Sequence, residues 1–145
     1  MLIIEPRSKE EFDQYFYLRW ELLRKPWNQV KGSEKDEMEK DCIHAMMYEV
    51  PHLPIGVSRL QFNSPLEAQI RYMAVKDDYR GKGIGTLLID YLEKKAIEQK
   101  TIQRIVLQAR SNAVIFYEKN GYRIKEKSFL LWGTIQHYLM EKVLF

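Results

Sequence analysis

Apolar residues recur every three to four positions in two long stretches of the chain, which indicates two amphipathic helices. The earlier stretch begins after Ser8, and Glu11 stands three residues later, the spacing of a capping box. This helix is expected to run to about Lys25, just before Pro26. The clearer stretch follows a glycine cluster at residues 81–85. Its apolar residues are Ile84, Leu87, Leu88, Tyr91, Leu92 and Ala96.

Two shorter helices are also predicted. Ser33 and Asp36 are good N-cap residues, so we expect a helix from there through the low forties, with the charge run at residues 31–41 as its solvated face. The other covers residues 113–119, and Gly121 is its expected left-handed C-cap.

Runs of alternating or β-branched residues indicate seven strands, at residues 2–5, 45–50, 55–62, 68–75, 104–109, 122–131 and 136–144. Short turns join the second, third and fourth strands, which must therefore be antiparallel neighbours. The strand, helix and strand from 68 to 109 form a βαβ unit with a right-handed crossover. The sequence thus predicts an α/β (α+β) fold in which a mixed sheet of about seven strands is flanked by about four helices. The expected order is β-α-α-β-β-β-α-β-α-β-β.

Composition limits the classes of function. The 145 residues, 46% hydrophobic and 30% charged, suit a single domain spanning 1–145. The net charge of +3 does not indicate a nucleic-acid partner, although it would tolerate an anionic small molecule. Cys42 is the only cysteine, and a buried thiol is favoured over a nucleophile. With neither a signal segment nor an 18-residue apolar run, we expect a cytoplasmic protein that does not bind membranes.

The segment from Arg80 to Thr86 joins a strand to a helix and contains three glycines at alternate positions. Backbone N–H groups can turn inward there, and the helix adds its positive end, so the loop is suited to a pyrophosphate. A plain turn is the alternative. The third glycine comes one residue too early for a Rossmann loop, and Lys82 is not followed by Ser or Thr as in a Walker loop.

On these residues the chain resembles the GNAT superfamily of acyl-CoA-dependent N-acetyltransferases. The family signature is Arg or Gln, any two residues, Gly, any one, then Gly or Ala, and it is matched by Arg80, Gly83 and Gly85. The resemblance extends to the approach strand at 72–75, to the block at 112–122, and to the order of elements along the chain.

The resemblance implies that acetyl-CoA is the cofactor, with its pantetheine arm on backbone groups of Met73 and Val75. Asn112 would fix the cofactor from the other side, and Phe116 would pack on it. Tyr117 occupies the usual position of the general acid that protonates the leaving thiolate; a pure packing role is its alternative. The implied cofactor-binding residues are Met73, Ala74, Val75, Arg80, Gly81, Lys82, Gly83, Ile84, Gly85, Thr86, Asn112, Phe116, Tyr117 and Lys119.

The general base is open. Many relatives carry a glutamate on the fourth strand, but Gln69 stands here and cannot accept a proton as a base. His137 on the last strand is the favoured candidate, and Glu67 and Glu21 are alternatives, each acting through water. No set of side chains shows zinc spacing, so we expect no metal.

The acceptor is expected between the first two helices and the closing hairpin. Strand alternation predicts that Gln69, Arg71, Met73 and Val75 share one face, where Arg71 could bind an acceptor carboxylate. Pairing of Arg19, Arg59 and Arg71 with structural carboxylates is the alternative. The candidate acceptor-binding residues are Arg19, Arg24, Trp27, Arg71 and Trp132.

The resemblance favours transfer of an acetyl group to a primary amine, of a small molecule or a peptide, by direct attack in a ternary complex. A non-catalytic acyl-CoA-binding module is the alternative, motivated by Gln69. A homodimer is left open.

Overall fold

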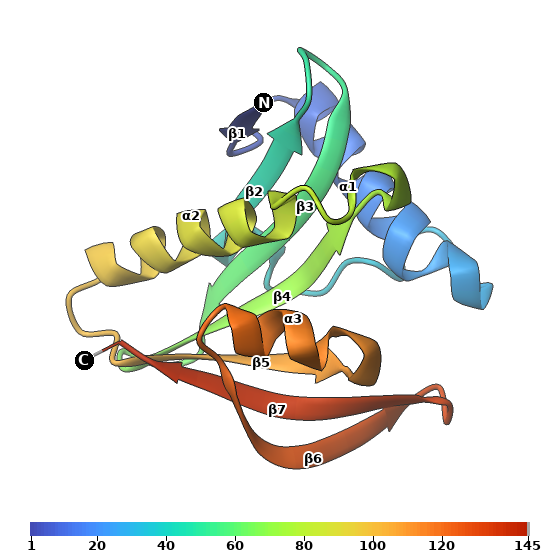
Figure 1. Cartoon of the computed structure of the whole chain (residues 1–145). Coiled ribbons are helices and arrows are strands. Elements are labelled where there is room, and N and C mark those ends of the chain that lie inside the picture. Colours follow the sequence, from blue (N-terminus) through green and yellow to red (C-terminus); the bar gives the residue numbers. More distant parts are fainter. Residues whose placement is uncertain (145) are drawn as a thin grey trace.

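The computed structural model describes residues 1–144 and consists of one seven-stranded sheet with helices on both faces (Figure 1). The strand order is β1-β2-β3-β4-β5-β7-β6. The strands are β1 (Leu2–Ile4), β2 (Ile43–Tyr48), β3 (Pro54–Phe62), β4 (Glu67–Val75), β5 (Arg104–Arg110), β6 (Arg123–Leu131) and β7 (Ile135–Val143). The α-helices are α1 (Lys9–Leu23), α2 (Ile84–Glu98) and α3 (Val114–Lys119). Short 3-10 turns are η1 (Lys25–Trp27), η2 (Glu39–Asp41), η3 (Asp77–Tyr79) and η4 (Ser111–Ala113).

Strand pairing follows the predicted mixed topology. β2, β3 and β4 are antiparallel neighbours, whereas β4 and β5 are parallel and are joined through α2. The closing strands β6 and β7 form an antiparallel hairpin, in which β7 pairs with β5. The predicted fold class is therefore confirmed.

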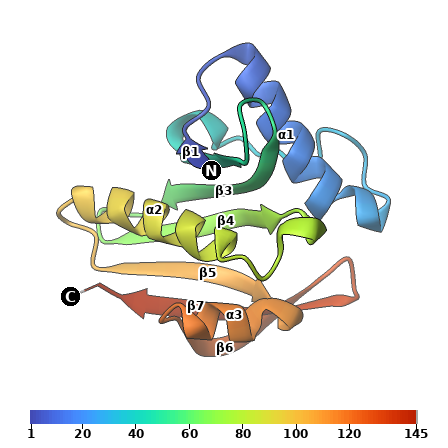
Figure 2. The same ribbon diagram turned by 45° about the horizontal axis from the view of Figure 1, so that its top comes forward.

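Alternation along the strands separates two hydrophobic cores. In β2, Ala45 and Met47 pack in the core that includes α2 and α3, while Met46 packs in the core beneath α1. Figure 2 shows α2 in front of β3 and β4, and α3 in front of β5 and β7. We call the two sides of the sheet the α1 side and the α2–α3 side.

The first helix begins at the predicted capping box. The Ser8 hydroxyl accepts from the Glu11 backbone N–H at 3.1 Å, and the Glu11 carboxylate accepts from the Ser8 N–H at 3.1 Å. The helix ends at Leu23, two residues before the predicted end. The predicted left-handed cap is also present, because Gly121 has a φ of +92°.

The predicted helix after Ser33 is wrong: within this part of the chain only the three-residue turn η2 is helical. Its lysines are exposed, as the prediction of a solvated face implied, but Glu34, Asp36 and Glu39 are buried or half-buried. Asp36 accepts two hydrogen bonds from the buried guanidinium of Arg59, and Glu39 accepts one from the buried Arg19. The segment is thus held in an irregular path across the α1 side by ion pairs, which local helix signals do not reveal.

The predicted alternation along the fourth strand is interrupted by a β-bulge. Val57 pairs with Ala74 and Arg59 with Arg71, so Tyr72 and Met73 together face Ser58. Tyr72 has a φ of +57°. After the extra residue, the odd-numbered side chains of β4 face the other side of the sheet. Arg71 lies on the α1 side, near Asp36, whereas Met73 and Val75 pack in the α2–α3 core. The prediction that all four residues share one face is therefore wrong.

Candidate functional site

A cavity of about 310 Å³ lies where β4 and β5 separate. The two strands pair only from Glu67 and Arg104 to Ile70 and Leu107. Beyond that point β4 bulges and the strands diverge, which leaves the gap. The lining residues are Leu23, Arg24, Gln69, Ile70, Arg71, Tyr72, Met73, Leu107, Gln108, Ala109, Arg110, Ala113, Tyr117, Phe129, Leu131 and His137.

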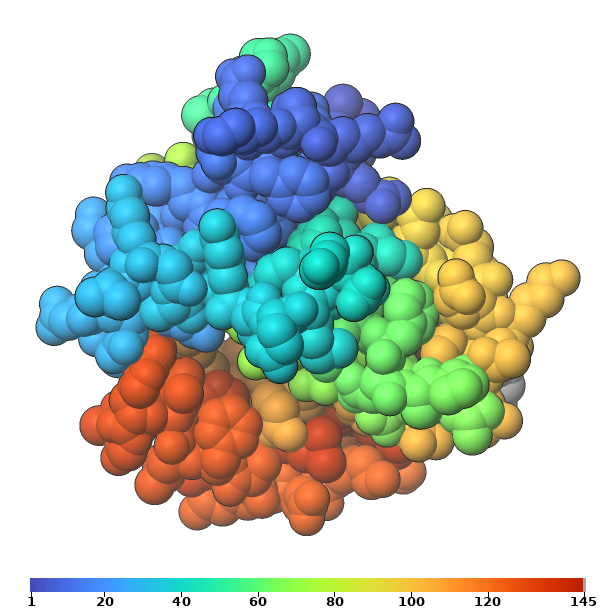
Figure 3. Space-filling model, turned by 180° about the vertical axis from the view of Figure 1, so that it is seen from behind, coloured from blue at the N-terminus to red at the C-terminus, as the bar shows by residue number. Residues whose placement is uncertain are grey.

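The cavity has a different character on each side of the sheet. Leu107 and Ala109 belong to the α2–α3 core, as does Tyr117. Alternation therefore places Arg110 on the α1 side, where His137 is its register partner in β7. Figure 3 shows the α1 side hollowed between the segment that follows α1 and the β6–β7 hairpin. A ligand could therefore reach the gap from either face.

Tyr117 forms part of the wall on the α2–α3 side. Its side chain is 8% exposed, and the ring packs edge-on against Phe116 and Tyr122. Burial raises the pKa of its hydroxyl, so the group is protonated at neutral pH and can donate a proton. Among residues 1–144 the hydroxyl has no hydrogen-bond partner, which leaves it available to a ligand.

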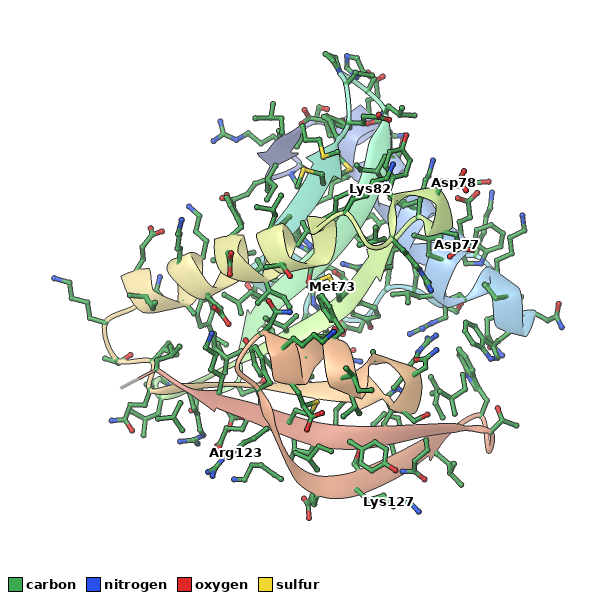
Figure 4. The ribbon with its side chains drawn as sticks, viewed as in Figure 1. Met73, Asp77, Asp78, Lys82, Arg123 and Lys127 are labelled. Atoms are coloured by element: carbon green, nitrogen blue, oxygen red, sulfur yellow. The ribbon has the colours of Figure 1, made fainter. Side chains whose placement is uncertain are left out.

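The glycine loop leads from β4 into α2. Gly81 and Gly83 have φ values of +76° and +81°, and no atom lies within 4 Å of a Cβ built on either. No side chain caps α2, so the first-turn N–H groups are free. Around the loop, Lys82, Asp77 and Asp78 extend outward (Figure 4). The exposed Arg80 pairs with Asp77 at 3.2 Å. The loop thus presents free amides and two exposed cations, Arg80 and Lys82.

The first turn of α2 also approaches α3 closely. A Cβ at Gly85 would lie 2.8 Å from the Phe116 ring, so the glycine permits this contact. Met73 lies between α2 and α3 (Figure 4). Asn112 is exposed in η4, and Lys119 is exposed at the end of α3. These predicted cofactor residues therefore flank the α2–α3 side of the gap, whereas Ala74 faces the core beneath α1.

His137 lines the cavity on the α1 side. Its ring stacks on Phe129 with centroids 4.4 Å apart, and its Nδ1 lies 3.0 Å from the Ile135 carbonyl oxygen. A proton on Nδ1 would leave Nε2 as an acceptor. Burial lowers the pKa of His137, and the charge of Arg110 lowers it further, so the ring is neutral at pH 7.

The other two candidate bases, Glu67 and Glu21, do not line the cavity. Glu67 pairs with Arg104 at 2.9 Å, and this contact and its hydrogen bond from Asn63 hold its pKa below the usual value. Glu21 lies on α1. Gln69 does line the cavity, where its side-chain oxygen accepts from Asn63 at 3.0 Å. The geometry therefore brings His137, rather than either glutamate, to the cavity.

Arginines dominate the charge of the α1 side. Arg24 and Arg71, both predicted, line the cavity together with Arg110, which the sequence analysis missed. Alternation from the apolar Leu107 and the position at the end of a strand could have identified it. The rings of Trp27 and Trp132 pack in a tilted pair with centroids 5.8 Å apart, and the Arg110 guanidinium lies 4.4 Å from the Trp27 ring centre. The predicted acceptor residues therefore gather here, except Arg19.

Arg19 lies apart from the cavity in a buried polar network. Its side chain is fully buried, and it donates to Glu39 at 2.8 Å and to the Tyr15 hydroxyl at 2.7 Å. The structural pairing considered for Arg19 and Arg59 thus describes both, and Arg19 is not among the residues that line the cavity. Burial raises the pKa of the nearby Cys42, so its thiol is protonated at neutral pH.

Comparison with known proteins identifies the class. The acetyltransferase (GNAT) domain model matches residues 41–124. The uncharacterized N-acetyltransferase YjcF of Bacillus subtilis is 31% identical over 143 residues, covering 98% of this chain and 99% of that protein. The chain therefore belongs to the GNAT acetyltransferase family, and it is an acyltransferase, as predicted from the glycine loop and the block at 112–122.

Solved structures share the fold. An acyl-CoA N-acyltransferase from Pseudomonas aeruginosa has a TM-score of 0.81 at 18% identity, covering 97% of both chains. An aminoglycoside 6'-N-acetyltransferase complexed with coenzyme A has a TM-score of 0.78 at 20% identity, covering 100% of this chain and 98% of the other. Within residues 1–144, no helix has the length and apolar character needed to cross a bilayer.

Proposed function

We propose that the protein transfers an acetyl group from acetyl-CoA to a primary amine. One observation carries the proposal: the cavity is lined from both sides of the sheet, by Tyr117 on one side and by His137 with three arginines on the other. A thioester and an amine could therefore meet in the gap from opposite faces. The family and the coenzyme A bound to the similar aminoglycoside acetyltransferase support the choice of donor.

The residues present fit coenzyme A. Free N–H groups at the start of α2, in an open glycine loop with Arg80 and Lys82, suit a diphosphate. The edge of β4 that faces β5 is unpaired after Ile70, so backbone groups of Met73 and Val75 are free to bind an extended amide arm. Phe116, Asn112 and Lys119 border the same path.

Acetyl-CoA would supply a thioester whose C–S bond breaks as the amine forms a C–N bond. Tyr117 would donate its hydroxyl proton to the departing sulfur, since a phenol is protonated at neutral pH and burial favours that form further. The neutral His137 would accept the proton that the amine loses, through water. Both residues line the cavity, which allows the two proton transfers to occur in one site.

The proposal is tested by thiol release from acetyl-CoA with a panel of amines, together with calorimetric binding of coenzyme A. Tyr117→Phe should lower kcat by roughly 100-fold and leave coenzyme A affinity within about twofold. Tyr17→Phe, on the exposed surface of α1, is the matched control. Wild-type turnover by a folded Tyr117→Phe protein would remove the residue from the mechanism, and coenzyme A binding without turnover of any amine would favour the non-catalytic alternative.

A further inference from the structure

The α1 side of the cavity has an unbalanced positive charge. Arg24, Arg71 and Arg110 line the cavity, and none of its lining residues is an aspartate or a glutamate. Asp36 is the carboxylate closest to this group: it lies 3.3 Å from Arg71, but it is already bound by two nitrogens of Arg59, at 2.8 and 2.9 Å. The lining therefore keeps a surplus of guanidinium groups.

Arg24 and Arg110 have no carboxylate partner within residues 1–144. Arg24 donates to the carbonyl oxygens of Ser33 and Leu23, both at 3.1 Å. Arg110 donates to the Leu23 carbonyl at 3.4 Å, and its guanidinium lies over the Trp27 ring. Neutral carbonyl groups and indole rings orient these guanidiniums but do not neutralise them.

The surroundings make this charge costly. Burial lowers the pKa of Arg110, and the charge of Arg24 lowers it further. Burial also lowers the pKa of Arg24, and the charges of Arg71 and Arg19 lower it further, while Tyr72 and Glu34 act in the opposite direction. Two partly buried cations that repel each other are destabilising without a counter-charge, and a bound anion would relieve both effects.

The arrangement also argues against a polycationic acceptor. A substrate with several ammonium groups would be repelled by Arg24, Arg71 and Arg110, and the cavity offers it no carboxylate. Its volume of about 310 Å³ suits a small molecule. The acceptor class therefore differs from that of the aminoglycoside acetyltransferases that share the fold.

We infer that the acceptor is a small amine that also carries an anionic group, a carboxylate or a phosphate, which is bound by Arg24 and Arg110. The inference rests on the proposed acetyl transfer. The anion would lie against the two guanidiniums on the α1 side, with planar N–H groups suited to two acceptor oxygens. The amine would then face the gap between β4 and β5, with His137 beside Arg110.

The test compares paired amines that differ in charge: amino acids with their carboxamides, phosphoethanolamine with ethanolamine, and spermidine as a polycation. Thiol release from acetyl-CoA gives kcat/KM for each. The kcat/KM of the amine that carries an acid group should be about tenfold or more above that of its neutral partner, because the neutral partner lacks a charged hydrogen bond. The two pairs distinguish a carboxylate from a phosphate acceptor.

Variants connect this preference to the cavity. We compare the kcat/KM of the acidic amine with that of its neutral partner. This ratio should fall by about tenfold in Arg110→Gln and in Arg24→Gln, mainly through KM. Arg123→Gln, at an exposed position on β6, is the matched control and should keep the wild-type ratio. Thermal melts and calorimetric binding of coenzyme A establish that each variant is folded and retains its donor site.

A preference for spermidine, or a ratio that survives in both folded cavity variants, would overturn the inference while leaving acetyl transfer intact. Failure of the proposed function has a different signature: no thiol release with any amine. If one of the two variants fails to fold, an unchanged ratio in the other contradicts the inference, and the comparison of paired amines on the wild-type protein needs no variant.

Discussion

At the scale of single residues, the protonation state of His137 decides whether it can act as a base. Burial lowers its pKa below the ordinary value of 6.5, so the neutral ring predominates at pH 7 and is lost only at more acidic pH. We predict that kcat/KM of the wild type falls on the acidic side of pH 6.5, and that His137→Gln flattens this limb and lowers kcat by roughly 100-fold. The measurement is the pH dependence of thiol release with one saturating donor.

The same variant separates catalysis from packing. His137 stacks on Phe129, so its loss could also disturb the β6–β7 hairpin. Phe129→Leu removes the stacking partner and keeps the imidazole, and should retain the acidic limb. An acidic limb unchanged in a folded His137→Gln protein would mean that another group causes the limb, and would leave the base to water or to a glutamate.

Residue types alone distinguished the arginines poorly. Arg19 falls in the apolar stripe of its helix, a pattern compatible with either a buried ion pair or a ligand contact, and the structure shows the ion pair. Arg110 ends a strand whose apolar residues were recognised, yet its role depends on how β4 and β5 diverge. That divergence is a tertiary feature, which one sequence does not display.

At the scale of elements, the glycine loop and the first turn of α2 act as one unit. We predict that Gly83→Val weakens coenzyme A binding by about tenfold or more, because a β-branched residue resists the φ of +81° and displaces amides that hydrogen-bond a charged group. Calorimetry with coenzyme A measures this.

Gly32→Val is the matched control. Gly32 has a φ of +102° and no atom within 4 Å of a built Cβ, so the substitution introduces similar strain outside the loop. Both variants should lose some stability, but only Gly83→Val should lose coenzyme A affinity. Equal coenzyme A affinities in the two variants would mean that the glycine loop does not bind coenzyme A.

The elements that could be predicted are those set by local patterns. The capping box, the period of α2 and the turns between β2, β3 and β4 are all written in neighbouring residues, and each was found. The helix expected after Ser33 was wrong, and the bulge at Tyr72 was missed, because distant partners determine the backbone at both places. Ion pairs to Arg59 and Arg19 hold the segment after Ser33 in its irregular path, and a two-to-one pairing against Ser58 defines the bulge.

At the scale of the whole molecule, a buried ionic network joins three separate parts of the chain. Arg19 comes from α1, Arg59 from β3, and Asp36 and Glu39 from the irregular segment that precedes β2. His44 in β2 adds contacts from its ring nitrogens to the Tyr15 hydroxyl and the Glu39 carbonyl. The network fixes the segment that borders the α1 side of the cavity, so its charge state affects the stability of the entire layer.

Acid stability should therefore depend on Asp36. The hydrogen bonds from Arg59 lower the pKa of Asp36 to about 2, below its ordinary 3.8. The unfolded chain binds this proton first as the pH falls, so the stabilisation is complete above pH 4 and is lost between pH 4 and 2. Asp36→Asn should cost about 3 kcal/mol at pH 7, since it removes one of the two carboxylates, Asp36 and Glu39, that pair with the fully buried Arg59. Urea unfolding at several pH values measures both effects.

The pairwise comparison with wild type isolates this carboxylate from other groups that titrate in acid. Burial also lowers the pKa of His44 and of His137, so both histidines reduce stability as the pH falls below 6.5, in the variant and the wild type alike. The difference in free energy of unfolding between the wild type and Asp36→Asn should then be constant from pH 7 to about 4 and shrink below pH 4. Asp13→Asn, which breaks the exposed pair with Lys9, should follow the wild type throughout. A difference that stays constant down to pH 2 would mean that Asp36 titrates normally and that the network does not depend on its charge.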